Sequence, residues 1–533
     1  MHLVLPRAAA SSHRWTQAAI GVVFVVVATG IALVRFRCSP LYATLNDVNS
    51  DVYVYQVVGN SWVHGLLPYR DVYDVKGPFL YLLFKLFAWL RPWSMGPPLA
   101  ALGLLAFGSL CLAYAVAREY LQRRALAAVA AVGSCLLIYL SVATVPTSFT
   151  CEELAVPGVL LLLWLVTRWL DEPERKGVAS AWWILDGIVF AALFWSKYQV
   201  IAPWVAMLVA LAVIVVRGEL TPRSLGRVVV LHLAGAVLAT AAILVFYVPD
   251  LPDMLKAYFL AKRGSLDPAH ELLAEADFAS RTLTHNTAAA LALLGVLVLL
   301  FLRAVRRTSR DGLTLTIAFT LSLWAPAALV RHPNNLFVPL SFCAVATPQV
   351  LVAAQRRGEA AARAASAGVV ALAAAACLAP LAQGVATYGL LRHPQPLTCY
   401  RVPSLARTRS YERVTTVFAK TAGNRPILSV GTLFAARSSY VSHQPVRHPL
   451  QFVDASWSNN IGGDGVQTRY LQDRTFHYAW IHISGVDRFH NLEPQIAAAT
   501  YTDGPSQPDQ ATALAHNYVP ILLCNNEILL RAR

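Results

Sequence analysis

Apolar runs long enough to cross a membrane recur along the chain up to about residue 390. A transmembrane helix needs about 20 mostly apolar residues. Runs of this kind lie at 16–34, 98–117, 125–142, 154–170, 181–196, 198–216, 228–247, 285–302, 313–330, 336–354 and 364–390. Only 14% of the residues are charged, whereas soluble proteins carry about 25%. The sequence therefore excludes a soluble enzyme, a disordered chain and a fibrous protein, and it predicts a polytopic all-α membrane protein.

A further apolar run, at 78–90, is short and contains Lys85, so we expect a helix that lies along the membrane surface. If this run does not span and the N-terminus is cytoplasmic, every arginine-rich loop falls on the inner side, as the positive-inside rule requires. These loops lie at 118–124, 175–176, 217–227, 303–310 and 356–363. We therefore expect about 11 spans with a cytoplasmic N-terminus. The same loops account for the net charge of +15 without a nucleic-acid partner.

The polar remainder of the chain, 391–533, is expected to form a separate extracytoplasmic α/β domain. The apolar run at 426–431 ends at a glycine and suits a buried strand, and 478–484 has a similar pattern. The stretch 521–531 suits a closing hairpin. The predicted division is thus a membrane domain at 1–390, with a first outer loop at 38–97, and a C-terminal domain at 391–533. Cys399 and Cys524 flank that domain in an oxidising compartment, where a disulfide between them is a candidate.

Ionisable residues other than the inner arginines gather in the outer loops, next to helix ends. The stretch 38–77 holds Asp51, Asp71 and Asp74 among several tyrosines. Carboxylates held near a membrane surface beside aromatic rings can act as general bases or bind hydroxyl-rich ligands. The alternative is a solvated loop whose acids pair with Arg70 and Lys76.

The run at 50–84 resembles the first periplasmic loop of bacterial GT-C glycosyltransferases, in the group related to protein O-mannosyltransferases and the lipid A aminoarabinose transferase. The matching positions, in order, are Asp51, Tyr53, Tyr55, Gly65, Pro68, Tyr69, Arg70, Asp71, Asp74, Lys76 and Pro78. The sequence departs from the family pattern at Ser50, where relatives have an acid, and at Gly77, which replaces a common proline. The resemblance implies the GT-C membrane fold with a short helix along the membrane after this loop.

Three further elements resemble the same family. The stretch 149–157 carries Glu152 and Glu153 ahead of a span, which could otherwise be a charge pair favoured by the helix dipole. Lys197 lies between two spans, where it could otherwise snorkel to the interface. The third element is the stretch 331–339, in which Arg331, His332 and Asn335 match the family pattern.

The resemblance implies an enzyme of the bacterial plasma membrane that moves a sugar from a polyprenyl-monophosphate donor to an extracytoplasmic acceptor hydroxyl, of a cell-envelope glycan, a lipid or a protein. Lys197, Arg331 and His332 would bind the leaving phosphate. Asp51 would be the base, with Asp74 in reserve, in a single inverting displacement. The remaining sugar or acceptor contacts would be Tyr53, Tyr55, Tyr69, Arg70, Asp71, Lys76, Glu152, Glu153 and Asn335.

No cofactor is required by this pattern, although Glu152 and Glu153 could hold a divalent metal ion. Two other functions stay open at this point: a transporter or flippase of a lipid-linked sugar, and a non-catalytic membrane scaffold. A transporter would place ionisable residues at mid-membrane. The embedded candidates are Asp186 and His232, which we expect near inner helix ends.

Overall fold

The structure is a computed structural model of the 533-residue chain. It describes residues 7–35, 51–72, 76–141, 149–171, 179–260, 287–305, 310–329 and 336–388 of the membrane domain. In the C-terminal part it describes residues 397–402, 404, 406–410, 414–423, 425, 427–430, 466–482, 508–524 and 527–533. Every structural statement below refers to these residues.

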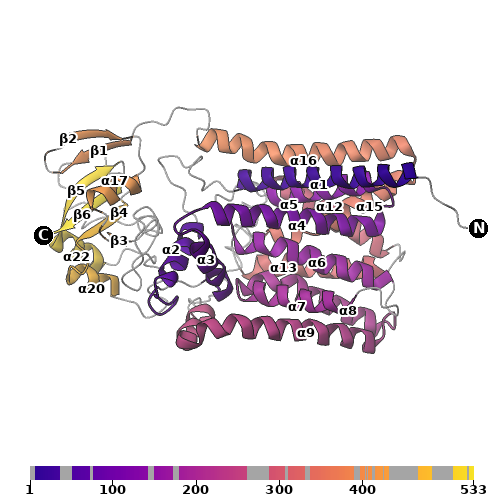
Figure 1. Ribbon diagram of the computed structural model, residues 1–533, viewed down its shortest axis with the longest axis horizontal. Helices are drawn as coiled ribbons and strands as arrows, with labels where there is room; N and C mark the ends of the chain where they lie inside the picture. The colour runs from indigo at the N-terminus through magenta and orange to yellow at the C-terminus, as the bar shows by residue number, and fades with distance from the viewer. Residues whose placement is uncertain are drawn as a thin grey trace, which may run out of the picture.

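The membrane domain is a bundle of helices that lie side by side with their axes roughly aligned (Figure 1). Its helices are α1 (Arg7–Arg35), α4 (Gly96–Tyr120), α5 (Arg124–Leu140), α6 (Cys151–Asp171), α7 (Ser180–Phe194), α8 (Ala202–Val216), α9 (Pro222–Leu244), α12 (Thr287–Val305), α13 (Arg310–Leu329), α15 (Cys343–Gln355) and α16 (Glu359–Tyr388). Each predicted apolar run coincides with one of these helices. Six helical segments of the described chain are long and apolar enough to cross a membrane. The total of about 11 spans stays a prediction.

Two short helices lie crosswise at one end of the bundle, next to the C-terminal domain (Figure 1). They are α2 (Asp51–Val63) and α3 (Pro78–Leu90), the run expected along the membrane surface. Pro78 suits the start of α3, because the first turn of a helix leaves its N–H groups unbonded. The two helices touch closely at Gly59, where a Cβ atom would lie 2.4 Å from the Phe84 carbonyl oxygen. This contact fixes the outer loop against the helix that follows it.

At the same end of the bundle, α9 gives way to a series of short turns (Figure 1). These are η2 (Val245–Asp250), α10 (Leu251–Leu255) and η3 (Lys256–Leu260). Pro249 lies inside η2 and Pro252 begins α10. Because proline cannot donate a backbone hydrogen bond and clashes with the preceding turn, two prolines this close end the regular helix.

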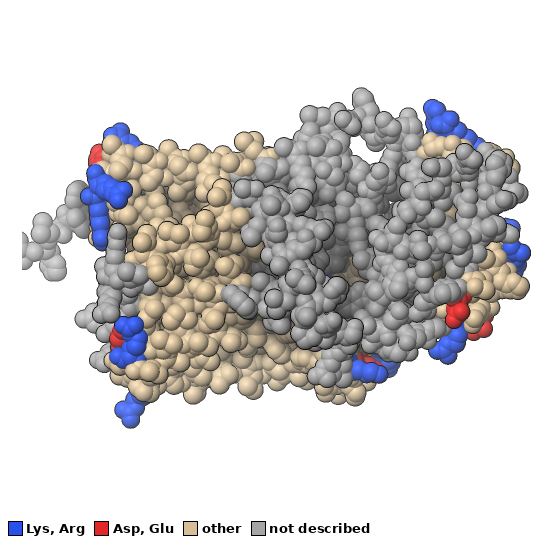
Figure 2. All heavy atoms as spheres, turned by 180° about the vertical axis from the view of Figure 1, so that it is seen from behind, with Lys and Arg blue, Asp and Glu red and all other residues tan. Residues whose placement is uncertain are grey.

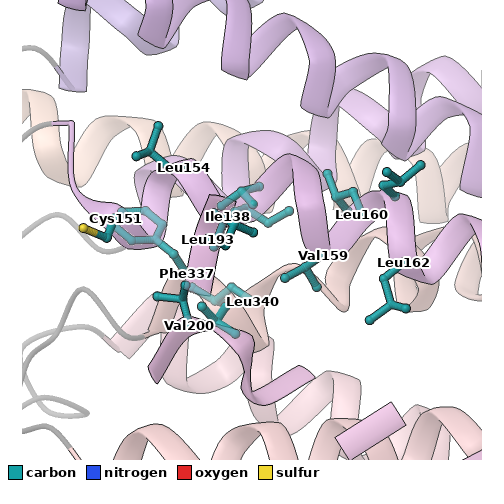
Figure 3. Close-up of a cluster of buried hydrophobic side chains, with 14 of the residues drawn as sticks. Ile138, Cys151, Leu154, Val159, Leu160, Leu162, Leu193, Val200, Phe337 and Leu340 are labelled. Atoms are coloured by element: carbon teal, nitrogen blue, oxygen red, sulfur yellow. The ribbon is translucent and has the colours of Figure 1, made fainter. Parts of the chain in front are cut away.

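The core of the bundle is centred on α6, whose side chains are apolar and buried on nearly all sides (Figure 3). Leu154, Val159 and Leu160 of α6 pack among residues of α5, α7 and the short helix α14 (Phe337–Leu340). By contrast, α9 exposes many large apolar side chains, such as Val230 and Val237. A helix that is apolar all round is buried by its neighbours or by lipid, so α9 presents the lipid-facing surface of the bundle.

The C-terminal domain is a six-stranded sheet with helices packed on it. Its strands are β1 (Leu397–Arg401), β2 (Ala406–Ser410), β3 (Ile427–Val430), β4 (Tyr478–His482), β5 (Tyr518–Cys524) and β6 (Glu527–Ala532), in the order β2-β1-β5-β6-β4-β3. Only the β3–β4 pair is parallel among these strands. The helices are α17 (Val414–Thr421), α20 (Val466–Gln472) and α22 (Pro508–Asn517). The predicted strands at 426–431 and 478–484 coincide with β3 and β4, and the predicted hairpin is β5–β6.

A disulfide joins Cys399 of β1 to Cys524 of β5. The two residues are direct partners in the antiparallel register of these strands, with their Cα atoms 4.2 Å apart. The bond therefore ties the first strand of the domain to the closing hairpin, and it is the pair that the sequence offered as a candidate.

Charged side chains are concentrated at the two ends of the molecule. Figure 2 shows Lys and Arg at the end of the bundle opposite the C-terminal domain and again around that domain. On this face, the described surface of the bundle between the two ends shows neither basic nor acidic side chains. Such an apolar belt is what a lipid bilayer requires. The inward orientation of the arginine-rich end stays a prediction from the positive-inside rule.

Candidate functional site

Glu153 is held at the start of α6 by a reciprocal pair of hydrogen bonds with Thr150. The Thr150 N–H donates to Glu153 Oε2 at 3.0 Å, and the Glu153 N–H donates to Thr150 Oγ1 at 3.3 Å. This is a capping box, which satisfies two otherwise unbonded N–H groups of the first helical turn. The arrangement explains why a glutamate three residues after a threonine begins this helix.

The other oxygen of Glu153 forms a buried ion pair with the end of α1. Arg35 Nε donates to Glu153 Oε1 at 2.6 Å, and both side chains are almost fully buried. The Arg35 guanidinium also lies 5.0 Å from the centre of the Phe337 ring in α14. Glu153 therefore links the start of α6 to the end of α1, and Arg35 extends this contact to α14. A structural role at the start of the helix accounts for these contacts of Glu153. Arg35 was missed in the sequence, although the two arginines at the end of the first span, Arg35 and Arg37, were the available signal.

Glu152 and Lys197 form a second ion pair beside the first, between Lys197 Nζ and Glu152 Oε1. Glu152 is buried, whereas the Lys197 side chain keeps 14% of its surface exposed. Lys76 lies within electrostatic range of the same carboxylate. Three of the residues predicted for the site are thus brought together at one rim of the bundle, with two cations around one acid.

Backbone contacts between two loops create this cluster. The Gly77 N–H donates to the Ser196 carbonyl at 3.1 Å, and the Phe79 N–H donates to the Trp195 carbonyl at 3.0 Å. A Cβ atom on residue 77 would lie 2.0 Å from the Trp195 oxygen, so only glycine permits this approach. The departure from the family's proline is therefore explained: Gly77 lets the loop that carries Lys76 lie against the turn that carries Lys197.

The predicted tyrosines lie in the core rather than on the surface. Tyr53, Tyr55 and Tyr69 are each less than 5% exposed. The Tyr69 ring packs edge-on against Tyr81, with centroids 5.5 Å apart, and its hydroxyl donates to the Lys76 carbonyl at 2.6 Å. These rings pack against protein and hold the loop in shape. Their contact with a sugar stays a prediction.

Arg70 and Asp71 form a local, solvent-exposed pair at the turn before the cluster. Arg70 donates from Nε and Nη2 to the two oxygens of Asp71, at 2.9 and 2.7 Å. The Leu67 N–H also donates to Asp71 Oδ2 at 2.8 Å. The hydrogen bonds from Arg70 lower the pKa of Asp71 below its ordinary value of 3.8. For these two residues, the structure agrees with the alternative of a solvated loop in which an acid pairs with Arg70.

The remaining predicted site residues lie outside the described part of the chain. Asp51 is the first residue of α2, but its side chain is not among those described. Asp74, Arg331, His332 and Asn335 lie in stretches that the structure does not describe. The roles of Asp51 and Asp74 as bases, of Arg331 and His332 as phosphate ligands, and of Asn335 as a sugar or acceptor contact stay predictions from the resemblance.

Asp186 and His232 lie in the middle of their helices, which corrects the expectation that they lie near inner helix ends. His232 Nδ1 is 2.8 Å from Asp186 Oδ2, and Trp204 Nε1 donates to both oxygens of Asp186 at 3.2 Å. The pair forms because α7 and α9 touch at Gly187 and Gly235, where a Cβ atom would lie 2.0 Å or less from the facing backbone oxygen. The buried carboxylate is thus fully partnered within the bundle.

A divalent metal ion does not fit the described residues. No three His, Cys, Asp or Glu side chains gather there in an arrangement that could hold one. Glu152 and Glu153, the acids offered for a metal, are each already paired with a cation of the protein. A metal would have to displace Lys197 or Arg35, so no step below is routed through one.

The aligned helical bundle, the crosswise helices at one end and the sheet domain beside them define a fold class, and solved structures share it. No protein-family model matches the sequence, and no curated protein does. The fold is similar to that of GT-C glycosyltransferases, as the outer-loop motif predicted.

One such structure is ArnT from Cupriavidus metallidurans bound to undecaprenyl phosphate, at 13% identity and a TM-score of 0.55, covering 96% of this chain and 97% of that chain. A second is the oligosaccharyltransferase AglB from Archaeoglobus fulgidus in complex with an inhibitory peptide and a dolichol-phosphate, at 13% identity and a TM-score of 0.51. It covers 96% of this chain and 75% of that chain. At these identities the similarity establishes the fold.

Proposed function

We propose that this protein is a membrane glycosyltransferase that moves a sugar from a polyprenyl-monophosphate carrier to a hydroxyl group outside the cytoplasm. The observation that carries the proposal is the cluster of Lys76, Lys197 and Glu152 at the rim of a GT-C fold. The similar structures of ArnT and AglB hold undecaprenyl phosphate and dolichol-phosphate, respectively. A lipid phosphate is thus the ligand that this fold and two neighbouring lysines favour together.

The lysines supply the charge that the leaving group needs. As the bond between the sugar and the phosphate breaks, negative charge grows on the phosphate oxygens, and cations fixed beside them lower the energy of that state. In the free protein Glu152 keeps Lys197 oriented and partly neutralised. When phosphate enters, Lys197 and Lys76 face it, and Arg331 and His332 complete the phosphate contacts. Glu152 then acts on Lys197 and does not touch the sugar.

The acceptor hydroxyl attacks from the face of the sugar opposite the phosphate. Asp51, at the start of α2, takes the hydroxyl proton as the new bond to the anomeric carbon forms, with Asp74 as the reserve. One displacement of this kind inverts the anomeric configuration and needs no covalent enzyme intermediate. Arg70, Asp71 and Asn335 complete the polar contacts of sugar and acceptor. The protein lies in the plasma membrane of a bacterium, with its N-terminus cytoplasmic and its C-terminal domain outside.

The test is transfer by purified protein in detergent from a panel of radiolabelled undecaprenyl-phosphate sugars: mannose, glucose, galactose, arabinose and an aminopentose. Asp51→Asn and Lys197→Ala should each remove more than 99% of the transfer. The unfolding temperature should stay close to that of the wild type for Asp51→Asn and should fall for Lys197→Ala, because that change leaves the buried Glu152 carboxylate without its counterion. Asp253→Asn and Lys256→Ala are matched controls, because both residues are exposed on the turns after α9. No transfer from any donor, or full transfer by Lys197→Ala, contradicts the proposal.

A flippase for a lipid-linked sugar is the second candidate, and the Asp186–His232 pair in the middle of the bundle favours it. It predicts that protein in liposomes moves a fluorescent undecaprenyl-phosphate sugar across the bilayer without any acceptor. Asp186→Asn would then stop this movement, whereas a glycosyltransferase would show transfer and no movement. A non-catalytic scaffold, the third possibility, predicts neither activity and no effect of Asp51→Asn on sugar transfer in cells.

A further inference from the structure

A buried carboxylate without a hydrogen-bond partner lies where α9 gives way to short turns. Asp250, the last residue of η2, is 2% exposed, and neither of its carboxylate oxygens is hydrogen-bonded to any residue that the structure describes. It also takes the N-cap position of α10, where an aspartate usually accepts a backbone hydrogen bond, yet its side chain makes no capping bond. Burying a carboxylate without a hydrogen-bond partner costs free energy, so such a group calls for an explanation. A ligand that donates hydrogen bonds to these oxygens would supply one.

No described charged group forms a direct ion pair with Asp250. Arg70, Asp71 and Asp253 lie within electrostatic range. Arg70, the only cation of the three, places its two donors on Asp71. Asp253 is exposed and has the same sign of charge as Asp250. Neither an ion pair nor a local cap therefore explains this carboxylate.

Asp250 belongs to the same rim as the Lys197–Glu152 pair. The Tyr247 hydroxyl, one turn earlier on η2, donates to the Pro78 carbonyl at 2.5 Å. Pro78 follows Gly77, whose N–H is bonded to the Ser196 carbonyl next to Lys197. The turn that carries Asp250 thus supports the loop that carries Lys76, and the charged neighbours of Asp250 include Arg70 and Asp71 of the stretch just before that loop.

The chemistry of a lone carboxylate selects the ligand. A divalent cation takes about six or more oxygen ligands, and the described residues offer no group of three His, Cys, Asp or Glu side chains around it. Sugar hydroxyls suit it better, since each O–H donates one hydrogen bond and a carboxylate accepts a pair of them strongly. We propose that Asp250 binds substrate by accepting hydrogen bonds from sugar hydroxyl groups, of the lipid-linked donor or of the acceptor. This inference rests on the proposed function.

Equilibrium binding to full-length protein in nanodiscs tests it with three probes. They are bare undecaprenyl phosphate, the undecaprenyl-phosphate sugar that the wild type binds most tightly, and the methyl glycoside of that sugar, which stands for an acceptor. Asp250→Leu should weaken binding of one sugar-containing probe about 10-fold or more, with bare undecaprenyl phosphate unchanged. Asp250→Asn should weaken it less, because the amide keeps one acceptor. Asp253→Asn is the matched control and should bind all three probes as the wild type does.

The probe that loses affinity identifies the source of the hydroxyls: the lipid-linked sugar for a donor contact, and the methyl glycoside for an acceptor contact. Asp250→Leu should also raise the unfolding temperature of the ligand-free protein, because an apolar side chain removes a buried unpaired charge. Unchanged binding of both sugar probes by Asp250→Leu overturns the inference and leaves the proposed function intact. A wild type that never prefers a sugar-loaded lipid to the bare phosphate overturns both. If an added divalent metal ion weakens binding of the sugar-containing probes to the wild type but not to Asp250→Leu, Asp250 binds a cation. That result also overturns the inference.

Discussion

Individual acids at the outer rim differ in what holds them, although the sequence shows them as one acidic group. Glu153 is fixed by Thr150 and Arg35, Glu152 by Lys197, and Asp71 by Arg70. Their burial also differs, from fully buried at Glu153 to partly exposed at Asp71. Burial decides the energetic weight of each pair, because water and salt screen exposed charges and leave buried ones strongly coupled.

Removing one partner of the buried pair should destabilise the protein strongly. Glu153→Gln leaves the Arg35 charge buried without its counterion, which costs about 3–5 kcal/mol. The double variant Arg35→Met with Glu153→Leu should recover part of this loss, since no charge is then buried. The measurement is the unfolding free energy in detergent. Glu219→Gln breaks the exposed Arg217–Glu219 pair as a control and should cost less than about 1 kcal/mol. Equal losses for the two pairs would refute the burial argument.

The Arg70–Asp71 pair should contribute to stability near neutral pH and lose that contribution at low pH. The folded-state pKa of Asp71 is lowered from 3.8, so its contribution is present above about pH 4 and disappears as the pH falls through the folded value. Asp71→Asn should therefore lose a small amount of stability at pH 6 and show a shallower decrease below about pH 4 than the wild type. Unfolding temperatures between about pH 3 and pH 6 check this, and identical acid limbs for both proteins would contradict it.

At the scale of elements, the site depends on two loops that touch through glycine. The loop 76–79 and the turn 195–197 each carry one lysine, and their backbone hydrogen bonds set the spacing of the two charges. The outer end of α9 adds the third support through Tyr247.

A single added methyl group at Gly77 should separate these loops. Gly77→Ala would place its Cβ against the Trp195 carbonyl, and a shift of about 1 Å in a site of this kind can lower turnover about 100-fold. Gly21→Ala is the matched control, since a Cβ there meets no atom within 4 Å. The transfer assay and the unfolding temperature are measured together. Wild-type transfer by Gly77→Ala would show that the loop contact does not position the lysines.

Sequence patterns predicted the elements well and the contacts between them poorly. The apolar runs coincide with helices, and the strands at 426–431 and 478–484 were recognised from their patterns, because both signals are local in the chain. The partners of Glu152 and Glu153 are 45 and 118 residues away, so no local pattern reveals them. Tyr55 and Tyr69 were assigned to a sugar site from the resemblance of the 50–84 run, and no local pattern reveals that both rings are buried. Asp250 was missed because its neighbouring sequence has no motif.

The whole molecule is polarised along the axis of its bundle. The C-terminal domain and the crosswise helices lie at one end, and a basic surface lies at the other (Figures 1 and 2). The lysine cluster lies at the start of the crosswise helix α3, because the turn of Lys197 is hydrogen-bonded to Gly77 and Phe79. A bilayer between the two ends would place the candidate site on the same side as the sheet domain. The Cys399–Cys524 bond is consistent with an oxidising compartment on that side.

This polarity predicts where fused reporters work. Alkaline phosphatase joined after residue 533 should be active in bacterial cells, because it folds only outside the cytoplasm, and the same fusion in the 217–227 loop should be inactive. A fluorescent protein that matures only in the cytoplasm should give the reverse pattern. Active phosphatase at the 217–227 loop would show that the molecule has the opposite orientation, with the candidate site on the cytoplasmic side.

The most direct test of the central claim is an electron cryo-microscopy structure of the protein in nanodiscs with undecaprenyl phosphate. The account predicts phosphate density within hydrogen-bond distance of the Lys197 Nζ atom, with Lys76 on its other side and the lipid chain between bundle helices. Phosphate bound at the basic end of the bundle, or at the outer end but away from both lysines, would contradict it.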